Sequence, residues 1–410
     1  MREFDSKKAE FYLEEVIDGY KVSPKLKHIW GIQLDILERI SFVCNKYNLK
    51  WFIAHGTLLG AVRHGGYIPW DDDIDINMPR EDFEKLMSVA QKEFMNPYYC
   101  QWDEWDPRFL GFARVRYANS TALFYGDISY GDVNGGIWVD IFPMDGVIED
   151  EDERAAQSEE LERYRRLNYA DTYGDFYYAY YGIDDVSWTG YIEEARALTD
   201  KYGRKWLRQQ FVDICKRGNT GHEVRSAIHC LRTNYECCYW FKEDYDELID
   251  INFMGKKYPA PKGWERCLKI KWKDYMQFPP VEQRGYKHLE HIIDPYIPYY
   301  EYPFERFTSF HKFNMHRKLI LVCAGRACDD FIERYRNQYD ISIIVDNSTH
   351  LQGQKKMGII IRPVEYLKDI IHKKEYQVIL CTSYYVEVQE QVKSYGFDES
   401  YIYIKDRKYI

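Results

Sequence analysis

The spacing of apolar residues divides the first part of the chain into alternating helices and strands. Apolar positions recur every three or four residues over residues 24–48 and 80–94, which predicts two amphipathic helices. Another helix is expected to begin at Thr57, after a short apolar run. Apolar runs, or apolar and polar residues in alternation, predict strands over residues 51–54, 71–77, 110–117 and 137–142. The pattern therefore predicts a core that mixes strands and helices.

The apolar pattern changes in residues 149–250, which are rich in charged residues and tyrosine. Helical spacing over residues 151–167 and 188–217 predicts a helical subdomain that packs on the core. Residues 291–317 combine three prolines and many aromatic residues without a clear period, which predicts an irregular connector.

Residues 318–410 alternate buried-strand runs with helical stretches, which predicts a small parallel α/β domain. This segment resembles the Rossmann-type modules of sugar-nucleotide-modifying and CoA-binding proteins. Gly325 keeps only the middle glycine of the usual motif, and Asp346 follows at the spacing of a ribose-binding acid. Dinucleotide binding, binding of another small ligand, and a scaffold or dimerisation role are all open for this domain.

Four carboxylates stand within five consecutive residues, at positions 71, 72, 73 and 75. On a strand, Asp71, Asp73 and Asp75 would share one face, with neighbours ~7 Å apart, and Asp72 would take the other face. At an effective dielectric constant near 20, each such pair repels by roughly 2 kcal/mol. Binding Mg²⁺ would offset that repulsion, and a solvated acidic turn is the alternative. Asp73 and Asp75 are the better pair for one ion, and Asp71 can join them only if the chain bends after Trp70.

Upstream of the acids, Gly56 and Thr57 stand where a strand is expected to turn into a helix. Unpaired backbone N–H groups and the helix dipole favour a phosphate at such a turn, and the Thr57 hydroxyl can cap the helix or bind a phosphate oxygen. Arg63 follows one to two turns later. A phosphate-binding turn before an Asp-x-Asp strand indicates metal-assisted phosphoryl or nucleotidyl transfer.

The segment HGTLLGAVRHGGYIPWDDDIDINMPR, residues 55–80, resembles the signature of the LicD family, which includes the fukutin-type proteins. Two later segments resemble the other blocks of that family, and they are residues 136–146 and 274–288. The resemblance implies an α+β nucleotidyltransferase-fold core with a helical insertion, over residues 1–290, with the insertion at 149–250. The small α/β domain at 318–410 would follow the connector at 291–317.

The resemblance also implies roles for single residues. Gly56 and Thr57 match the phosphate turn, although its second position is commonly Ser. Asp73 and Asp75 match the metal-binding pair, and Asp140 matches the third carboxylate, which completes the metal site or takes the proton of the acceptor. The resulting metal set is Asp71, Asp73, Asp75 and Asp140, for Mg²⁺ or Mn²⁺. The candidates to neutralise the donor diphosphate or leaving group are Arg63, Arg116 and Arg284.

Members of this family move a phospho-alcohol from a CDP-alcohol to a glycan hydroxyl. The resemblance therefore implies transfer of phosphocholine from CDP-choline, with release of CMP, to a cell-surface glycan, lipopolysaccharide or teichoic acid precursor. Two alternatives are open. The donor could be CDP-ribitol, CDP-glycerol or another nucleotide, or the chain could be a catalytically silent glycan-binding or assembly protein. The segment 149–250 is expected to recognise the acceptor, because nothing in it resembles catalytic residues.

Composition narrows the partners and the compartment. The chain has 410 residues and a net charge of −10, which argues against nucleic acid as a partner. The ten cysteines form no CxxC pair and no zinc spacing, so reduced thiols are expected. The charged N-terminal sequence and the absence of a long apolar run predict a cytoplasmic protein. Peripheral membrane association through a glycolipid acceptor and a homodimer are further expectations.

Overall fold

The computed structural model describes residues 9–123, 133–173, 185–219, 224–227, 239–285, 292–302, 318–336, 340–382, 385–397 and 400–402. The chain divides into two compact units. One consists of residues 1–173 and 191–302, and the other of residues 174–190 and 303–410. Predictions for residues between the described ranges, such as most of the expected connector, lie outside the described residues.

The first unit is built on a seven-stranded mixed sheet. Strand β8 (Ile137–Gly146) lies at its centre and is buried along its whole length. It pairs in parallel with β4 (Asp75–Pro79), which pairs with β3 (Phe52–Ile53). On its other side, the first half of β8 pairs with β6 (Ala113–Tyr117) and the second half with β9 (Val224–Ala227). Strands β5 (Tyr98–Gln101) and β10 (Tyr239–Phe241) extend the sheet beyond β6 and β9.

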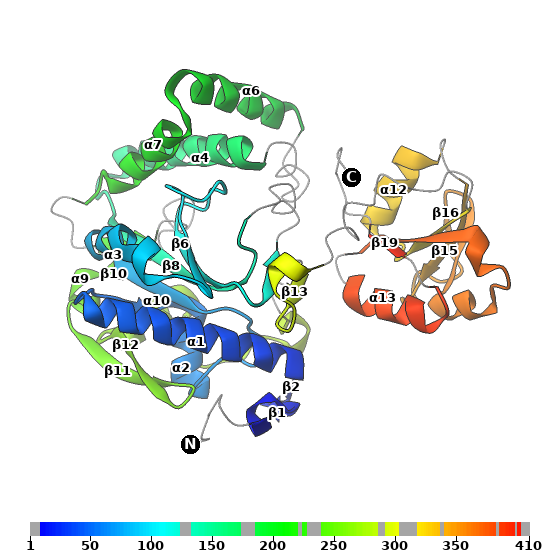
Figure 1. Cartoon of the computed structure of the whole chain (residues 1–410), viewed down its shortest axis with the longest axis horizontal. Coiled ribbons are helices and arrows are strands. Elements are labelled where there is room, and N and C mark those ends of the chain that lie inside the picture. Colours follow the sequence, from blue (N-terminus) through cyan, green and yellow to red (C-terminus); the bar gives the residue numbers. More distant parts are fainter. Residues whose placement is uncertain are drawn as a thin grey trace. The chain divides into compact units, whose positions relative to one another are not determined.

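Helices α1 (Pro24–Lys46) and α3 (Arg80–Glu93) pack on this sheet, and α1 runs across it in Figure 1. Helix α1 begins where the sequence predicts. The Ser23 hydroxyl accepts a hydrogen bond from Leu26 N, and Pro24 occupies the first turn, where its missing N–H has no cost. Its buried apolar residues form one stripe against the core, which confirms the helical period seen in the sequence.

The predicted helical segment is only partly helical. Helix α4 (Glu151–Tyr173) packs against α7 (Arg204–Lys216), and α6 (Asp185–Tyr202) precedes α7. The single helix expected at 188–217 is wrong, because Gly203 has φ +84° and ends the first helix before the second begins. Beyond α7, β9 and β10 return to the core sheet.

Smaller elements complete the first unit. Two of its hairpins are β1 (Glu15–Ile17) with β2 (Tyr20–Val22), and β11 (Leu248–Phe253) with β12 (Lys256–Pro261). Strand β13 (Ile292–Asp294) pairs with β7 (Thr121–Leu123), so this part of the expected connector belongs to the first unit. The remaining helices are α2 (His55–His64), α9 (Lys242–Tyr245) and α10 (Trp264–Trp272).

The second unit contains five parallel strands in the order β17-β15-β14-β18-β19, with β16 (Lys355–Lys356) antiparallel at the edge. In chain order the parallel strands are β14 (Lys318–Val322), β15 (Ile341–Asp346), β17 (Ile359–Pro363), β18 (Tyr376–Leu380) and β19 (Ser400–Ile402). Helices α12 (Arg326–Tyr335) and α13 (Tyr385–Ser394) follow β14 and β18. The strand order 3-2-1-4-5 is one found in doubly wound α/β sheets. Ligand binding by this unit stays a prediction.

The Asp346 carboxylate accepts hydrogen bonds from Ala324 N (2.5 Å) and Ser348 N (2.6 Å). The acid therefore lies beside the Gly325 turn, as its spacing predicts, but backbone groups already occupy its oxygens.

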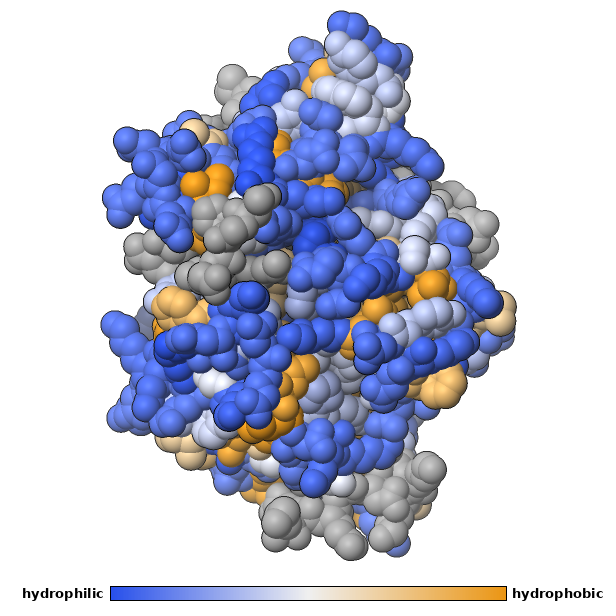
Figure 2. Space-filling model, turned by 90° about the vertical axis from the view of Figure 1, so that its left-hand side faces the viewer, coloured by the Kyte–Doolittle hydropathy of each residue, from blue (hydrophilic) through white to orange (hydrophobic). Residues whose placement is uncertain are grey.

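The surface carries scattered hydrophobic residues. The face of the molecule in Figure 2 is largely hydrophilic, with small hydrophobic areas between polar ones. Among the helices of the described ranges, none is long and apolar enough to cross a lipid bilayer.

Candidate active site

Two of the predicted acids meet on neighbouring strands. Asp75 begins β4 and is the register partner of Asp140 in the middle of β8. Partners in register point to the same face of a sheet and lie on strands about 4.8 Å apart. Asp140 is buried, and Asp75 is partly buried. The sheet thus brings together two carboxylates that are 65 positions apart in the sequence.

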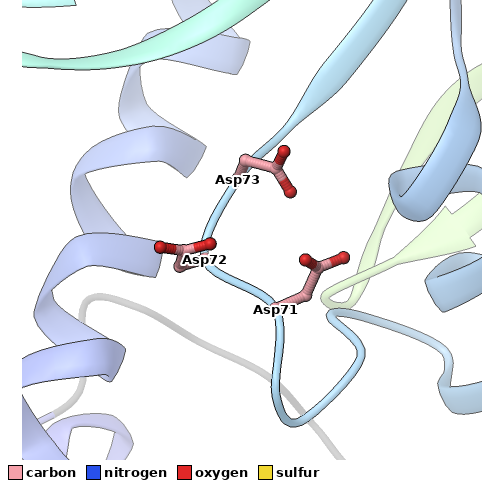
Figure 3. Close-up of side chains that lie close together, drawn as sticks. All are labelled: Asp71, Asp72 and Asp73. Atoms are coloured by element: carbon pink, nitrogen blue, oxygen red, sulfur yellow. The ribbon is translucent and has the colours of Figure 1, made fainter. Parts of the chain in front are cut away.

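The other acids of the cluster lie on a bend and not on a strand. The expected strand over residues 71–77 is wrong for its first half, because β4 begins only at Asp75. A turn at Pro69 and Trp70 brings Asp71 N within 2.9 Å of Ile68 O. Figure 3 shows the Asp71 and Asp73 side chains on one side of this bend and Asp72 on the other, toward α1. One carboxylate oxygen of each lies within 4.8 Å of the others.

The carboxylates near Asp75 change its pKa. Burial, followed by the negative charges of Asp73 and Asp140, raises the pKa of Asp75 well above its usual range. The Lys271 ammonium acts in the opposite direction, and Asp71 adds a smaller repulsion. The four carboxylates of the predicted metal set therefore form one electrostatic cluster.

Helix α2 begins at His55, two residues before the expected start at Thr57, so Gly56 lies in its first turn and not in the turn before it. A Cβ atom on Gly56 would lie 2.7 Å from Asp71 Oδ2, so any larger residue would displace that carboxylate. The Thr57 hydroxyl accepts a hydrogen bond from Asp75 N at 2.9 Å. Gly56 thus leaves space for the Asp71 carboxylate, and Thr57 holds the Asp75 backbone, at the α2 N-terminus, where the helix dipole favours anions.

Strand β6 supplies an arginine to the site, although not the one predicted. Arg114 is the register partner of Asp140, and its Nε donates to Asp140 Oδ1 at 2.6 Å. Its guanidinium also stacks 4.5 Å from the centre of the Trp138 ring. Arg114 therefore orients the Asp140 carboxylate.

Arg116, the predicted donor ligand, lies two residues further along the same strand and is fully buried. Its guanidinium donates to Gln101 Oε1, Ala122 O and Gly136 O. These contacts hold neighbouring segments together, so the structure places Arg116 in the protein core. This placement favours a structural role in place of the predicted diphosphate contact.

The other two predicted arginines come together beside Asp71. Arg63 donates to the backbone oxygens of Tyr275 and Gln277, and Arg284 donates to Pro279 O. The rings of Trp70 and Phe278 lie between them, with guanidinium-to-ring distances of 4.9–5.9 Å.

Burial lowers the pKa of Arg63, the negative charge of Asp71 opposes that shift, and the Arg284 charge adds to it. The third sequence block thus packs against the first and adds a second cation next to the carboxylate cluster. The two guanidinium groups also cover ring faces that a quaternary ammonium group would otherwise use.

Two further residues of the site escaped the sequence prediction. His55 is buried and accepts a hydrogen bond through Nδ1 from the Lys271 ammonium at 2.8 Å. Lys271 lies in the last turn of α10, three residues before the recognised block at 274–288 but outside it. Only the fold brings it to the α2 N-terminus, whereas Arg114 could have been found as the in-register neighbour of Asp140.

The residues of this cluster fit a divalent cation. All four acids offer hard oxygen ligands, which Mg²⁺ prefers. Their mutual repulsion and the raised pKa of Asp75 show excess negative charge that a cation would neutralise. Asp71 and Asp73 point to the same side of the bend, so the cluster offers a common side for an ion (Figure 3).

Comparison with known proteins agrees with this geometry. Residues 48–163 match the family described as LicD/FKTN/FKRP, nucleotidyltransferase domain. The lipopolysaccharide cholinephosphotransferase LicD of Haemophilus influenzae is 24% identical over 268 residues, which cover 63% of this chain and 93% of that protein. The human ribitol 5-phosphate transferase FKRP is 33% identical over 76 residues, covering 18% of this chain and 15% of its own length. An uncharacterised protein of Rickettsia typhi is 62% identical over 67 residues, or 16% of this chain and 20% of that protein.

Proposed function

Because this chain carries a nucleotidyltransferase domain of the LicD family in residues 48–163, we propose that it transfers a phospho-alcohol from a nucleotide donor to a glycan hydroxyl. The observation that carries the proposal is the cluster of four carboxylates beside two stacked arginines and a helix N-terminus. We propose CDP-choline first, because the LicD relative named as a cholinephosphotransferase aligns over 93% of its length. CDP-ribitol is the second candidate, since FKRP is named as a ribitol 5-phosphate transferase.

The proposed reaction is a single displacement at phosphorus. The acceptor hydroxyl oxygen forms a bond to the phosphorus that carries the alcohol. The bond from this phosphorus to the bridging oxygen breaks, and CMP leaves with that oxygen. The hydroxyl proton passes to a carboxylate, for which we propose Asp140, because Arg114 holds it in a fixed orientation through one oxygen.

We propose that Asp73 and Asp75 would hold Mg²⁺ or Mn²⁺, with Asp71 as a further ligand and with Asp140 as the last ligand if it does not take the acceptor's proton. A divalent cation supplies positive charge where the diphosphate and the transferred phosphoryl group concentrate negative charge.

The chain itself would bind the donor through the first turn of α2 and through Arg63 and Arg284. Arg63 donates to two backbone oxygens and to His64 Nε2, and Arg284 donates to Pro279 O. None of these partners is a carboxylate, so both positive charges can act on a phosphate. Arg116 is not part of this donor-binding set because its guanidinium is bonded to Gln101, Ala122 and Gly136, and Arg114 acts on Asp140.

Acceptor recognition belongs to the helices that follow β8 in this proposal. A cavity of about 360 Å³ lies where α3 meets α7, and its lining includes Trp102, Arg208 and Gln209. Its volume is within the roughly 300–1,000 Å³ of small-molecule sites. A glycolipid acceptor would bring the protein to a membrane surface. The homodimer and the cytoplasmic location stay predictions.

The test is CMP release from a panel of CDP-alcohols in the presence of Mg²⁺, with EDTA and Asp73→Asn as controls. We expect one donor to give CMP and to raise the melting temperature. Full activity in EDTA would contradict the metal assignment. A protein that binds glycans but releases no CMP from any donor would instead support the silent, glycan-binding alternative.

A further inference from the structure

His55 holds an unusual backbone conformation at the start of α2. Its φ angle is +48°, a left-handed value that costs most residues free energy and that only Gly, Asn, Asp and His adopt with any frequency. The side chain is buried, with the rings of Phe142 and Trp240 edge-on at 5.8 and 5.9 Å. This conformation and packing direct the imidazole toward Lys271.

The contact between these residues defines the protonation of the imidazole. An ammonium group only donates, so His55 Nδ1 is the acceptor of the 2.8 Å bond and the proton of the neutral ring lies on Nε2. A neutral imidazole orients the Lys271 ammonium without cancelling its charge. Among the described residues, no carboxylate lies at ion-pair distance from Lys271 Nζ, while the field of this ammonium reaches Asp75.

The position of Lys271 near the start of α2 indicates what its ammonium group could bind. Its partner His55 is the first residue of α2, so the ammonium reaches the N-terminal end of that helix. Helix N-terminal N–H groups together with one lysine form a general arrangement for phosphate oxygens. Lys271 lies outside the three recognised segments, although close to the last of them, and its contact with His55 is produced by the fold.

We propose that Lys271 is a phosphate-binding residue of this site and that His55 is a positioning residue, which aims the ammonium at a diphosphate oxygen of the donor. This inference rests on the proposed function for the identity of the donor and not for the binding of phosphate. The ligand class is a diphosphate, either as part of a CDP-alcohol or as inorganic pyrophosphate.

The experiment measures binding by calorimetry for the full chain with CDP-choline and, separately, with pyrophosphate, each with Mg²⁺. Lys271→Gln should weaken both by about tenfold or more, as expected for a lost charge-assisted hydrogen bond. Lys271→Arg should recover part of the affinity. Lys269→Gln is the matched control on the same helix, because Lys269 pairs with the exposed Glu265, and it should bind as the wild type does.

Two substitutions at position 55 separate the imidazole from the backbone. His55→Gly accepts a positive φ without strain but loses the acceptor, so it should lower affinity toward that of Lys271→Gln. His55→Asn tolerates the same φ and offers an oxygen near the Nδ1 position, so it should restore most of the affinity. A structural role alone would not give rescue by Asn together with loss in Gly at similar melting temperatures.

The outcomes are distinct. Wild-type affinity for both ligands in a folded Lys271→Gln variant overturns the proposal, and so does equal affinity in His55→Gly and His55→Asn. Pyrophosphate binding that depends on Lys271, without CMP release from any donor, supports the phosphate contact and counts against the proposed function alone.

Discussion

Two acidic regions of the first unit, one fully buried and one partly buried, differ in how their negative charges are compensated. In the segment that follows β5, Asp106 accepts three hydrogen bonds from Arg108, through its backbone N, Nε and Nη2, at 2.8–2.9 Å. Arg80 forms a two-bond pair with Asp145 at the end of β8. In the carboxylate cluster, by contrast, Asp140 is paired with Arg114, while Asp75 is repelled by its acidic neighbours and only the Lys271 charge acts in the opposite direction on its pKa.

This difference separates acidic residues that stabilise the fold from acidic residues that we expect to bind a ligand. A buried carboxylate is stable when hydrogen-bond donors surround it, and breaking such a pair strands a charge. Carboxylates that repel one another, as around Asp75, lower stability and persist where they bind something. A buried carboxylate alone therefore does not mark the site, whereas carboxylates that repel one another do.

The largest expected effect follows from this imbalance at Asp75. Asp75→Asn should lower the rate of CMP release by more than about 100-fold, at least ~2.7 kcal/mol of transition-state stabilisation. Its melting temperature should stay equal or rise, because the substitution removes a buried charge among like charges. CMP release and thermal unfolding are the measurements. If Asp75→Asn loses activity and is also clearly less stable than the wild type, Asp75 belongs with the structural acids.

The opposite result is expected at Arg80. Arg80→Ala leaves Asp145 buried without its guanidinium partner, which should reduce the free energy of unfolding by about 3–5 kcal/mol. Turnover per folded molecule should be nearly unchanged. Denaturant unfolding measures the first quantity, and CMP release corrected for the folded fraction measures the second. A stable Arg80→Ala variant with little turnover would contradict the division between the two regions.

Asp103 is intermediate between the two kinds of acid. Its carboxylate accepts hydrogen bonds from Leu110 N and Gly111 N, yet burial raises its pKa to about 7. In the unfolded chain this group ionises near ~3.9. Between these values the folded state binds the extra proton, so the contribution to stability is present at low pH and is lost as the pH rises toward 7.

The expected outcome is measured against Asp103→Asn, which keeps an acceptor oxygen but has no titration. The unfolding free energy of the wild type relative to this variant should fall by about 2–3 kcal/mol between pH 5 and pH 8. Denaturant unfolding at each pH gives the difference, and other titrating groups cancel because both proteins contain them. A difference that is flat, or that grows with pH, contradicts the raised pKa.

The sequence predicted the parts of the site that lie close together along the chain. Helix α1, the strand carrying Asp140 and the pairing of a glycine turn with an Asp-x-Asp segment follow from local periodicity and local motifs. The bend at residues 71–73 was not predicted itself: it was named only as the condition under which Asp71 could join the metal site. Over four residues, a strand and a turn can show the same alternation of apolar and polar residues.

Other features depend on contacts that local patterns do not contain. Lys271 reaches His55 from 216 positions away. The division of 188–217 into two helices depends on one glycine with positive φ. The sequence does not show that residues 224–227 return to the core sheet, because this depends on their pairing with β8. Alternation correctly predicts that Arg114 and Arg116 share one face, but it does not say which of them meets an acid.

The smallest expected effect compares these two arginines, which lie on the same face of one strand. Arg114→Lys keeps a positive charge near Asp140 but loses the planar guanidinium that holds one of its oxygens. We expect about a tenfold loss in turnover, equal to ~1.4 kcal/mol, with little change in stability. Arg116→Lys should show the reverse, because one ammonium group does not reproduce the bonds that the guanidinium makes to Gln101, Ala122 and Gly136. Turnover and unfolding of both variants decide the matter, and a loss of turnover confined to Arg116→Lys would return the donor contact to Arg116.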